Sequence, residues 1–431
     1  MTNQTSDSSS LAALRARSQQ VLRDNDRGGY TVPSAKLYPF QWNWDAGVTA
    51  LGWMSFDEPR AWQELRMLFR GQWDNGLVPH IVFHQHADSY FPGPDQWGVP
   101  HTPPTSSISQ PPLLATMVRL MLERAADRAG AEAAARELLP KLVASHRWWY
   151  RERDPAQSGL VASFHPWESG VDNSPAWDAP LAVVPPATRT YQRRDTQLVN
   201  AAQRPHKAEY DRFLALVDLF RELDFDGAKI YAQSPYRVAD FGLNAILQRA
   251  TLDLAALCRQ YGQAEWAAEL DAHAARARPA LLGCWSESLQ QYVSRDLITG
   301  QPLERRVHSG FLAWYARLDD PRHDALLRSS LAGWLERAPF GLASTHPDAP
   351  QFEPQRYWRG PVWPHFNWLI AEGCAHYGMA DLHDRLRDDT QRLLQGAGLY
   401  EYFNPHTGEG YGGDNFSWTA AIALHWLDSP R

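Results

Sequence analysis

The chain has 431 residues and a formal net charge of −7 at pH 7, with 42 Lys and Arg residues against 49 Asp and Glu residues. This acidic balance argues against nucleic acid as a partner, because phosphate binding needs a basic face. Three cysteines, none in a CxxC pair, indicate a reduced protein without a disulfide framework or zinc cluster. We find neither a signal peptide nor an apolar run of about 18 residues, and therefore predict a cytoplasmic protein that has no membrane partner.

Apolar residues recur every three to four positions over most of the chain, which is typical of helices that bury one face. Strand patterns are few and are best at 77–84 and 291–293. The helices are expected, in chain order, at 11–24, 45–54, 59–70, 111–128, 131–152, 208–223, 237–260, 264–282, 308–318, 323–336, 361–377, 380–394 and 416–427.

These helices follow one another without a low-complexity linker or an obvious repeat. About a dozen helices, at about 36 residues per helix and loop, fit a double ring of alternating helices. We therefore predict an all-α fold, a barrel of two rings of alternating helices whose long loops form a pocket. Residues 1–11 are expected to be disordered and 12–431 to form a single catalytic domain.

The loops between the helices are unusually aromatic. The chain holds 19 Trp, 16 Tyr and 16 Phe residues, and many lie in Gly- and Pro-rich segments instead of helical stripes. Flat rings in loops suit stacking on sugars, so this distribution favours a carbohydrate ligand. The richest segments are 38–45, 84–110, 165–178, 353–365 and 400–415. The second, about 84–110, is predicted to act as a lid that brings Tyr90 over the sugar.

Two of these loops carry carboxylates suited to glycoside hydrolysis, which needs one carboxyl as acid and a second to activate water or attack the sugar. Asp172 lies between Trp167 and Trp177, where apolar rings would keep its carboxyl protonated. Its neighbours Glu168 and Asp178 remain alternatives. The partner should come from another loop, where Glu401 has Glu409 and Asp414 as rivals.

Other chemistries have less support. His80, His84 and His86 alternate along an expected strand, but no Cys or acidic residue completes a metal site, so we predict no metal. No GxGxxG, GxxxxGK[ST] or GxSxG motif occurs, and we predict no cofactor.

Five segments of the chain carry distinctive motifs: YPFQWNWDAG at 38–47, WESGVDNSPAWD at 167–178, EYDRF at 209–213, RYWRGPVWPHFNW at 356–368 and YEYFNPHTGEGYGG at 400–413. Together they resemble glycoside hydrolase family 63, and within it the compact bacterial mannosylglycerate and glucosylglycerate hydrolases. The resemblance runs in the family's order from about residue 12 to the C-terminus and implies an (α/α)6 barrel and an inverting mechanism.

The resemblance also implies roles for single residues. Asp172 is similar to the family's general acid and Glu401 to its general base. The remaining matches are expected to bind substrate, at the sugar subsite or on the aglycone side: Tyr38, Trp42, Trp44, Asp45, Gln110, Trp167, Arg212, Tyr357, Trp358 and Trp363.

A glycerate aglycone would need local cations, for which Arg212, Arg356 and Arg359 are the candidates, unless they pair with rim acids such as Glu353. The last loop departs from related sequences by carrying Asn404 and Asn415, which affects the expected choice of sugar or aglycone.

From these observations we expect an inverting α-glycoside hydrolase acting on a small glycoside, most simply 2-O-α-mannosylglycerate or glucosylglycerate. A trehalase-like α-glucosidase is the alternative within hydrolases. A sugar epimerase or isomerase would use His80, His165 or His365 as bases instead, and a non-catalytic sugar-binding protein would bind without turnover. The only partner expected is the glycoside, and the sequence leaves a homo-oligomer open.

Overall fold

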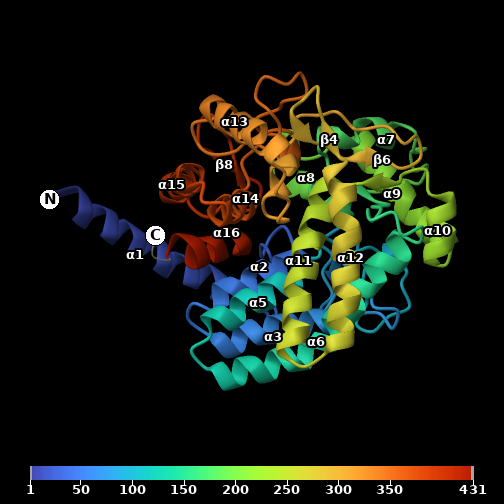
Figure 1. Cartoon of the computed structure of the whole chain (residues 1–431), viewed down its shortest axis with the longest axis horizontal. Coiled ribbons are helices and arrows are strands. Elements are labelled where there is room, and N and C mark those ends of the chain that lie inside the picture. Colours follow the sequence, from blue (N-terminus) through green and yellow to red (C-terminus); the bar gives the residue numbers. More distant parts are fainter. Residues whose placement is uncertain (1, 429–431) are drawn as a thin grey trace.

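The computed structural model describes residues 2–428 and consists mainly of helices (Figure 1). The α-helices are α1 Thr2–Asp24, α2 Asn43–Trp53, α3 Glu58–Leu68, α4 Pro94–Trp97, α5 Leu114–Arg124, α6 Arg128–Arg153, α7 Asp178–Ala182, α8 Asp195–Leu198, α9 Lys207–Glu222, α10 Gly227–Gln233, α11 Phe241–Gln260, α12 Ala264–Leu282, α13 Pro321–Arg337, α14 Pro364–His376, α15 Ala380–Gly396 and α16 Ser417–Ile422. Within these residues, no helix is long and apolar enough to cross a membrane.

Shorter elements connect these helices. The 3-10 turns are η1 Phe69–Gly71, η2 Pro166–Ser169, η3 Pro175–Trp177, η4 Ala201–Gln203, η5 His308–Ala313 and η6 Tyr357–Arg359, and η7 Ala423–Leu427 is a π-helix. The strands form antiparallel pairs of two residues each: β1 Gln41–Trp42 with β2 Ile81–Val82, β3 Val238–Ala239 with β6 Arg295–Asp296, β4 Trp285–Ser286 with β5 Gln291–Tyr292, and β7 Tyr402–Phe403 with β8 Gly410–Tyr411.

The helices close into two concentric rings. In the inner ring each element contacts the next, and the last contacts the first: α2, α5, α11, η5, α14 and α16. In the outer ring α3 packs on α2, α6 on α5, α12 on α11, α15 on α14 and α1 on α16, and α11 and α12 run side by side in Figure 1. The sixth outer helix is α13, whose Trp334 ring meets Phe311 of η5 edge to face with centroids 5.2 Å apart. The predicted (α/α)6 barrel is therefore confirmed.

The burial of each helix agrees with its ring. All residues of the inner helix α2 are buried, as expected for a helix surrounded on all sides. The outer helix α15 instead buries one stripe that includes Leu382, Leu386 and Leu393, and leaves other positions such as Asp381 and Arg392 exposed.

Two local expectations differ from the structure. The helix expected at 308–318 is the 3-10 turn η5 followed by turns, because it packs tightly on β5: a Cβ on Gly310 would lie 2.6 Å from the carbonyl oxygen of Tyr292. The strand expected at 77–84 is only β2, because its partner β1 is two residues long. Residues 2–11 form the first part of α1, which projects from the body in Figure 1; disorder there stays a prediction, and Met1 lies outside the described residues.

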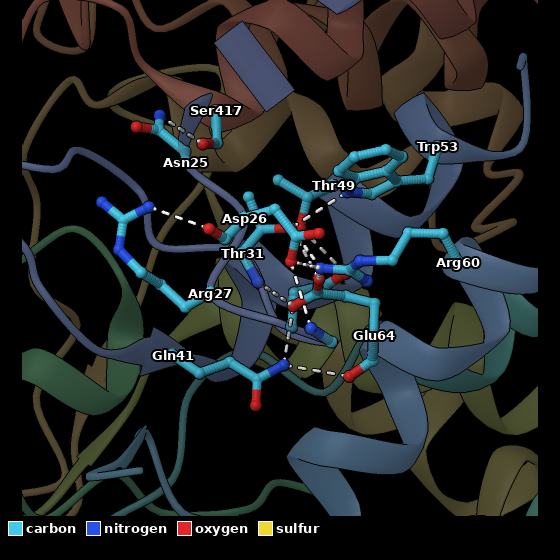
Figure 2. A network of polar contacts seen from close by, with 12 residues as sticks. Asn25, Asp26, Arg27, Thr31, Gln41, Thr49, Trp53, Arg60, Glu64 and Ser417 are labelled. Carbon is cyan, nitrogen blue, oxygen red and sulfur yellow. Dashed lines mark hydrogen bonds and ion pairs between the residues drawn. The ribbon is translucent and has the colours of Figure 1, made fainter. Parts of the chain in front are cut away.

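A buried polar network fixes the strand that leads into the pocket (Figure 2). Glu64 on α3 accepts hydrogen bonds from the backbone N–H of Thr31 at 3.1 Å, the Thr31 hydroxyl at 2.7 Å and Gln41 Nε2 at 2.6 Å. It also pairs with Arg60 at 2.9 Å. Because Gln41 begins β1, this network holds the strand that carries Trp42.

Candidate active site

The aromatic loops meet around one cavity of about 780 Å³, including its open mouth. Eleven of the thirteen residues predicted for the site line it: Tyr38, Trp42, Trp44, Asp45, Tyr90, Gln110, Trp167, Asp172, Tyr357, Trp358 and Glu401. The other lining residues are Pro33, His80, Phe91, Gly170, Asp195, Arg204, Pro205, Tyr210, Phe416 and Trp418.

The loop that presents Asp172 is held by its own side chains. The hydroxyl of Ser174 caps η3, and Trp177 Nε1 donates to the carbonyl of Val171 at 2.9 Å. Gly170 has φ +73°, and a Cβ there would lie 2.6 Å from the Trp44 ring, so both the turn and the close approach need glycine. This folding places Asp172 at the cavity wall.

The two alternatives in this loop are engaged elsewhere. Glu168 is fully buried, pairs with Arg153 at 2.6 Å and accepts the backbone N–H of Phe164 at 2.8 Å. Asp178 pairs with Arg359 at 2.8 Å. Neither lines the cavity, which leaves Asp172 as the carboxyl of this segment that faces it.

Glu401 faces the same cavity from the loop before β7. Its Oε1 accepts the Tyr38 hydroxyl at 2.9 Å and its Oε2 accepts the backbone N–H of Gly413 at 3.0 Å. A Cβ on Gly412, whose φ is +70°, would lie 2.2 Å from Oε2, so the glycine lets the loop close on the carboxylate. The rivals Glu409 and Asp414 do not line the cavity.

A buried ion pair beside Glu401 is absent from the sequence prediction. Arg204 Nε donates to Asp195 Oδ2 at 3.0 Å, and its Nη1 lies 3.7 Å from Glu401 Oε1. The Arg204 guanidinium also stacks 4.2 Å from the centre of the Tyr357 ring. Both residues come from the segment between α7 and α9, whose polar sequence carries no pattern that marks a site.

The carboxyls differ in their electrostatic surroundings. Burial raises the pKa of Asp172 well above its usual range, Glu401 raises it further, and only the charge of Arg204 and a backbone hydrogen bond oppose this. Burial also raises the pKa of Glu401, but Arg204, the N–H of Gly413 and the Tyr38 hydroxyl all favour its ionised form. The pair can therefore hold a proton at Asp172 beside a carboxylate at Glu401.

Aromatic rings form the rest of the wall. Tyr38 and Tyr90 meet Trp42 edge to face, with ring centroids 5.3 and 5.2 Å apart. Gln110 Oε1 accepts the backbone N–H of Trp44 at 3.3 Å at the start of α2. Asp45, in the first turn of the same helix, has its pKa raised well above the usual range by burial and by Glu401.

Two predicted site residues lie outside the cavity lining. Arg212 on α9 donates to the carbonyl of Ala208 at 2.9 Å. Trp363 is fully buried behind Trp358, with ring centroids 3.7 Å apart and planes 2° from parallel, so it supports a wall residue. Their substrate contacts stay predictions.

The rim arginines and the two asparagines of the last loop already have interaction partners within the protein. Arg356 and Arg359 both pair with Glu353, which is the alternative considered for them. Asn404 Oδ1 accepts the backbone N–H of His406 at 2.9 Å and so stabilises a turn. Asn415 has φ +48° and its carbonyl accepts Asn25 Nδ2.

The segment about 84–110 covers part of the cavity. It includes α4 and brings Tyr90 and Phe91 into the lining. Phe91 stacks on Tyr191 with ring centroids 5.5 Å apart, and the Tyr210 hydroxyl donates to the Phe91 carbonyl at 2.9 Å. This segment therefore contacts one residue that precedes Asp195 in the sequence and one that follows Arg204. Its closure on substrate stays a prediction.

The three histidines of 80–86 have separate partners. His80 bonds the Ser106 hydroxyl, His84 bonds Gln41 and His86 bonds Asp88. Within residues 2–428, no group of three or more His, Cys, Asp or Glu side chains is placed to hold a metal ion.

Comparison with known proteins finds relatives that match nearly the whole chain. A mannosylglycerate hydrolase from Thermus thermophilus is 48% identical over 411 residues, which are 94% of this chain and 99% of that protein. A glucosylglycerate hydrolase from Mycolicibacterium hassiacum is 34% identical, covering 96% and 97% of the two chains. The crystal structure of a family 63 mannosylglycerate hydrolase from Thermus thermophilus with Tris and D-glycerate superposes with a TM-score of 0.93 at 48% identity, covering 96% of this chain and all of that one.

The family model described as the mannosylglycerate hydrolase MGH1-like glycoside hydrolase domain matches residues 38–419. That range contains every residue predicted for the site and the inner ring up to Thr419, within α16. The chain is thus a glycoside hydrolase, and it belongs to the mannosylglycerate hydrolase MGH1-like family.

Proposed function

We propose that the protein hydrolyses 2-O-α-mannosylglycerate or 2-O-α-glucosylglycerate to hexose and glycerate with inversion at the anomeric carbon. The observation that carries the proposal is that Asp172 and Glu401 line one aromatic cavity from different loops, in different electrostatic surroundings. The substrates are those in the names of the relatives that match nearly the whole chain.

In the proposed reaction Asp172 donates its proton to the glycosidic oxygen as the bond to the anomeric carbon breaks. Glu401 accepts a proton from the water that attacks the opposite face of the sugar. The raised pKa of Asp172 suits an acid that must hold its proton near neutrality. An inverting reaction requires about 6.5–9.5 Å between the two carboxyls, to leave room for the water.

The cavity walls support this substrate class. Trp42, Trp44 and Tyr90 offer ring faces to a sugar, and Asp45 offers hydrogen bonds to its hydroxyls. Arg204 supplies a positive charge in the lining, and its Nη1 has no hydrogen-bond partner. This charge favours an anionic aglycone such as glycerate over a neutral disaccharide such as trehalose.

Proton NMR of the purified protein with mannosylglycerate, glucosylglycerate or trehalose tests the proposal. We expect one of the glycerate glycosides to release β-hexose as the first product, and Asp172→Asn to abolish this release. First release of α-hexose would contradict inversion. Turnover of trehalose alone would favour the trehalase-like alternative.

A histidine-based epimerase or isomerase receives less support. Of the three histidines considered, only His80 lines the cavity, and burial holds its pKa well below the usual range, which makes it a weak base. His165 is engaged by the carbonyl of Phe213 and the N–H of Trp167. Retained activity in Asp172→Asn together with loss in His80→Gln would reverse this ranking. A non-catalytic binder would show binding without turnover, and cytoplasmic location and self-association stay predictions.

A further inference from the structure

We infer that Asp195 is a positioning residue: it holds the Arg204 guanidinium away from Glu401, so that Glu401 stays free to take a proton from the attacking water. This inference rests on the proposed function and deepens it. It concerns a carboxylate that lines the cavity but belongs to neither the acid nor the base.

Asp195 lies between two arginines. Its Oδ2 accepts Arg204 Nε at 3.0 Å, and its Oδ1 accepts Arg193 Nε at 3.0 Å. The three side chains are nearly buried, with exposed fractions of 14% for Asp195, 7% for Arg204 and 9% for Arg193. Arg193 is itself held, because its Nη1 donates to the carbonyl of Pro205 at 2.6 Å and its guanidinium stacks on the Tyr210 ring at 4.3 Å.

The other contacts of Arg204 leave its tip atom Nη1 without a hydrogen bond. Its carbonyl accepts Arg356 Nη1 at 2.9 Å, and its guanidinium stacks on Tyr357. The tip atom Nη1 stands 3.7 Å from Glu401 Oε1, beyond hydrogen-bond distance. Without the bond from Nε to Asp195, the guanidinium would be drawn to Glu401 and could pair with it at about 2.8 Å. A base paired in this way would be slower to accept a proton.

The negative charge of Asp195 also favours protonation of Glu401. The Arg204 charge lowers the pKa of Glu401, whereas the Asp195 charge raises it. The pKa of Asp195 is itself about 2, with Arg204 and Arg193 both favouring its charged form, so Asp195 is ionised throughout an ordinary assay range. The other titratable groups that influence Glu401 or are influenced by it are Tyr38, Asp45, Asp172, Tyr357 and Tyr402.

Asp195→Asn tests this inference because it keeps the size of the side chain and removes its charge. We expect kcat to fall at least tenfold, and the acidic limb of kcat/KM, which reports the base of the free enzyme, to move down by about one pH unit. A merely structural role would lower activity or the melting temperature and leave the limb in place. Asp211→Asn is the matched control, since Asp211 binds Lys207 and Tyr191 nearby but does not line the cavity.

A second measurement separates this inference from the proposed function. The Glu401 carboxyl can be titrated by 13C NMR in the free protein, with its signal assigned by its loss in Glu401→Gln. Should the wild type hydrolyse none of the glycosides, the proposed function fails, but a lower Glu401 pKa in Asp195→Asn would still uphold the positioning role. Arg193→Gln, which loosens Asp195, should shift the titration in the same direction by less. An unchanged Glu401 titration in both variants would overturn the inference.

Discussion

Replacing Asp172 by Asn removes the proton donor and keeps the shape of the side chain. Asp172 is the carboxyl of its loop that faces the cavity, because Glu168 and Asp178 are held in ion pairs with other residues. A positioned general acid contributes about 10²- to 10⁴-fold, which corresponds to about 3–5 kcal/mol of activation free energy. With no neighbouring carboxyl of the loop to replace it, we expect a loss near the upper end on a glycerate glycoside.

The dependence on the leaving group makes this prediction specific. A glycosyl fluoride of the accepted sugar departs with little need of a proton, so Asp172→Asn should lose less than about tenfold on it. Glu401→Gln should lose activity on both substrates, because water must still be activated. Fluoride release and glycerate release, followed in parallel at saturating substrate, give both numbers.

The control for this series is Asp178→Asn, which removes a carboxylate of the same loop that pairs with Arg359 outside the cavity. Equal losses of Asp172→Asn on the fluoride and the glycerate glycoside would refute its role as the acid. A larger loss on the fluoride in Asp172→Asn than in Glu401→Gln would exchange the two roles.

Three further changes test the energetics of the pocket. Because folding raises the pKa of Asp172, the contribution of this carboxyl to the free energy of unfolding is present below about pH 4 and is lost as pH rises through the raised pKa. Asp172→Asn should therefore melt above the wild type in calorimetry, by a margin that grows with pH. A constant margin would contradict this. Gly170→Ala combines a left-handed backbone with a clash on Trp44 and should cost about 2–5 kcal/mol in urea unfolding, whereas a cost below about 1 kcal/mol would refute the close approach. Glu64→Gln leaves Arg60 in a buried site with one anionic partner fewer and should cost about 3–5 kcal/mol in the same assay, and a neutral effect would refute the role of the network in Figure 2.

The barrel could be predicted from the sequence because helices that bury one face carry apolar residues at helical spacing. The stripe of Leu382, Leu386 and Leu393 on α15 repeats at helical spacing, as the outer ring requires. The turn η5 carries the same apolar character, but its conformation depends on its contact with β5, which is a separate element of the chain. Periodicity cannot report such contacts, and the 3-10 turn was therefore expected as a helix.

For the active site, too, some features could be identified from the sequence and others could not. The loops of Asp172 and Glu401 could be identified because their aromatic, Gly and Pro residues are unusual for a connection. The choice of these two carboxyls over their neighbours came from the family resemblance. Trp363 belongs to the same aromatic stretch as Trp358, and the sequence does not distinguish the ring at the wall from the ring behind it. Arg204 lines the cavity but was not predicted, and Arg212 was predicted but lies outside the lining. An arginine in a polar segment looks the same whether its side chain faces solvent or the cavity.

The position of Arg204 has a consequence for the charge balance of the cavity. Asp45, Asp172, Asp195 and Glu401 all line it, and Arg204 is the lining arginine that faces them. With Asp195 and Glu401 ionised, Arg204 and Arg193, which also pairs with Asp195, only balance these two charges before an anionic aglycone enters. A further ionised carboxyl would repel glycerate, which is therefore best accommodated when Asp172 and Asp45 hold their protons, the state that burial favours for both. The protonated acid that hydrolysis requires is thus also the state in which the cavity best accepts its proposed substrate.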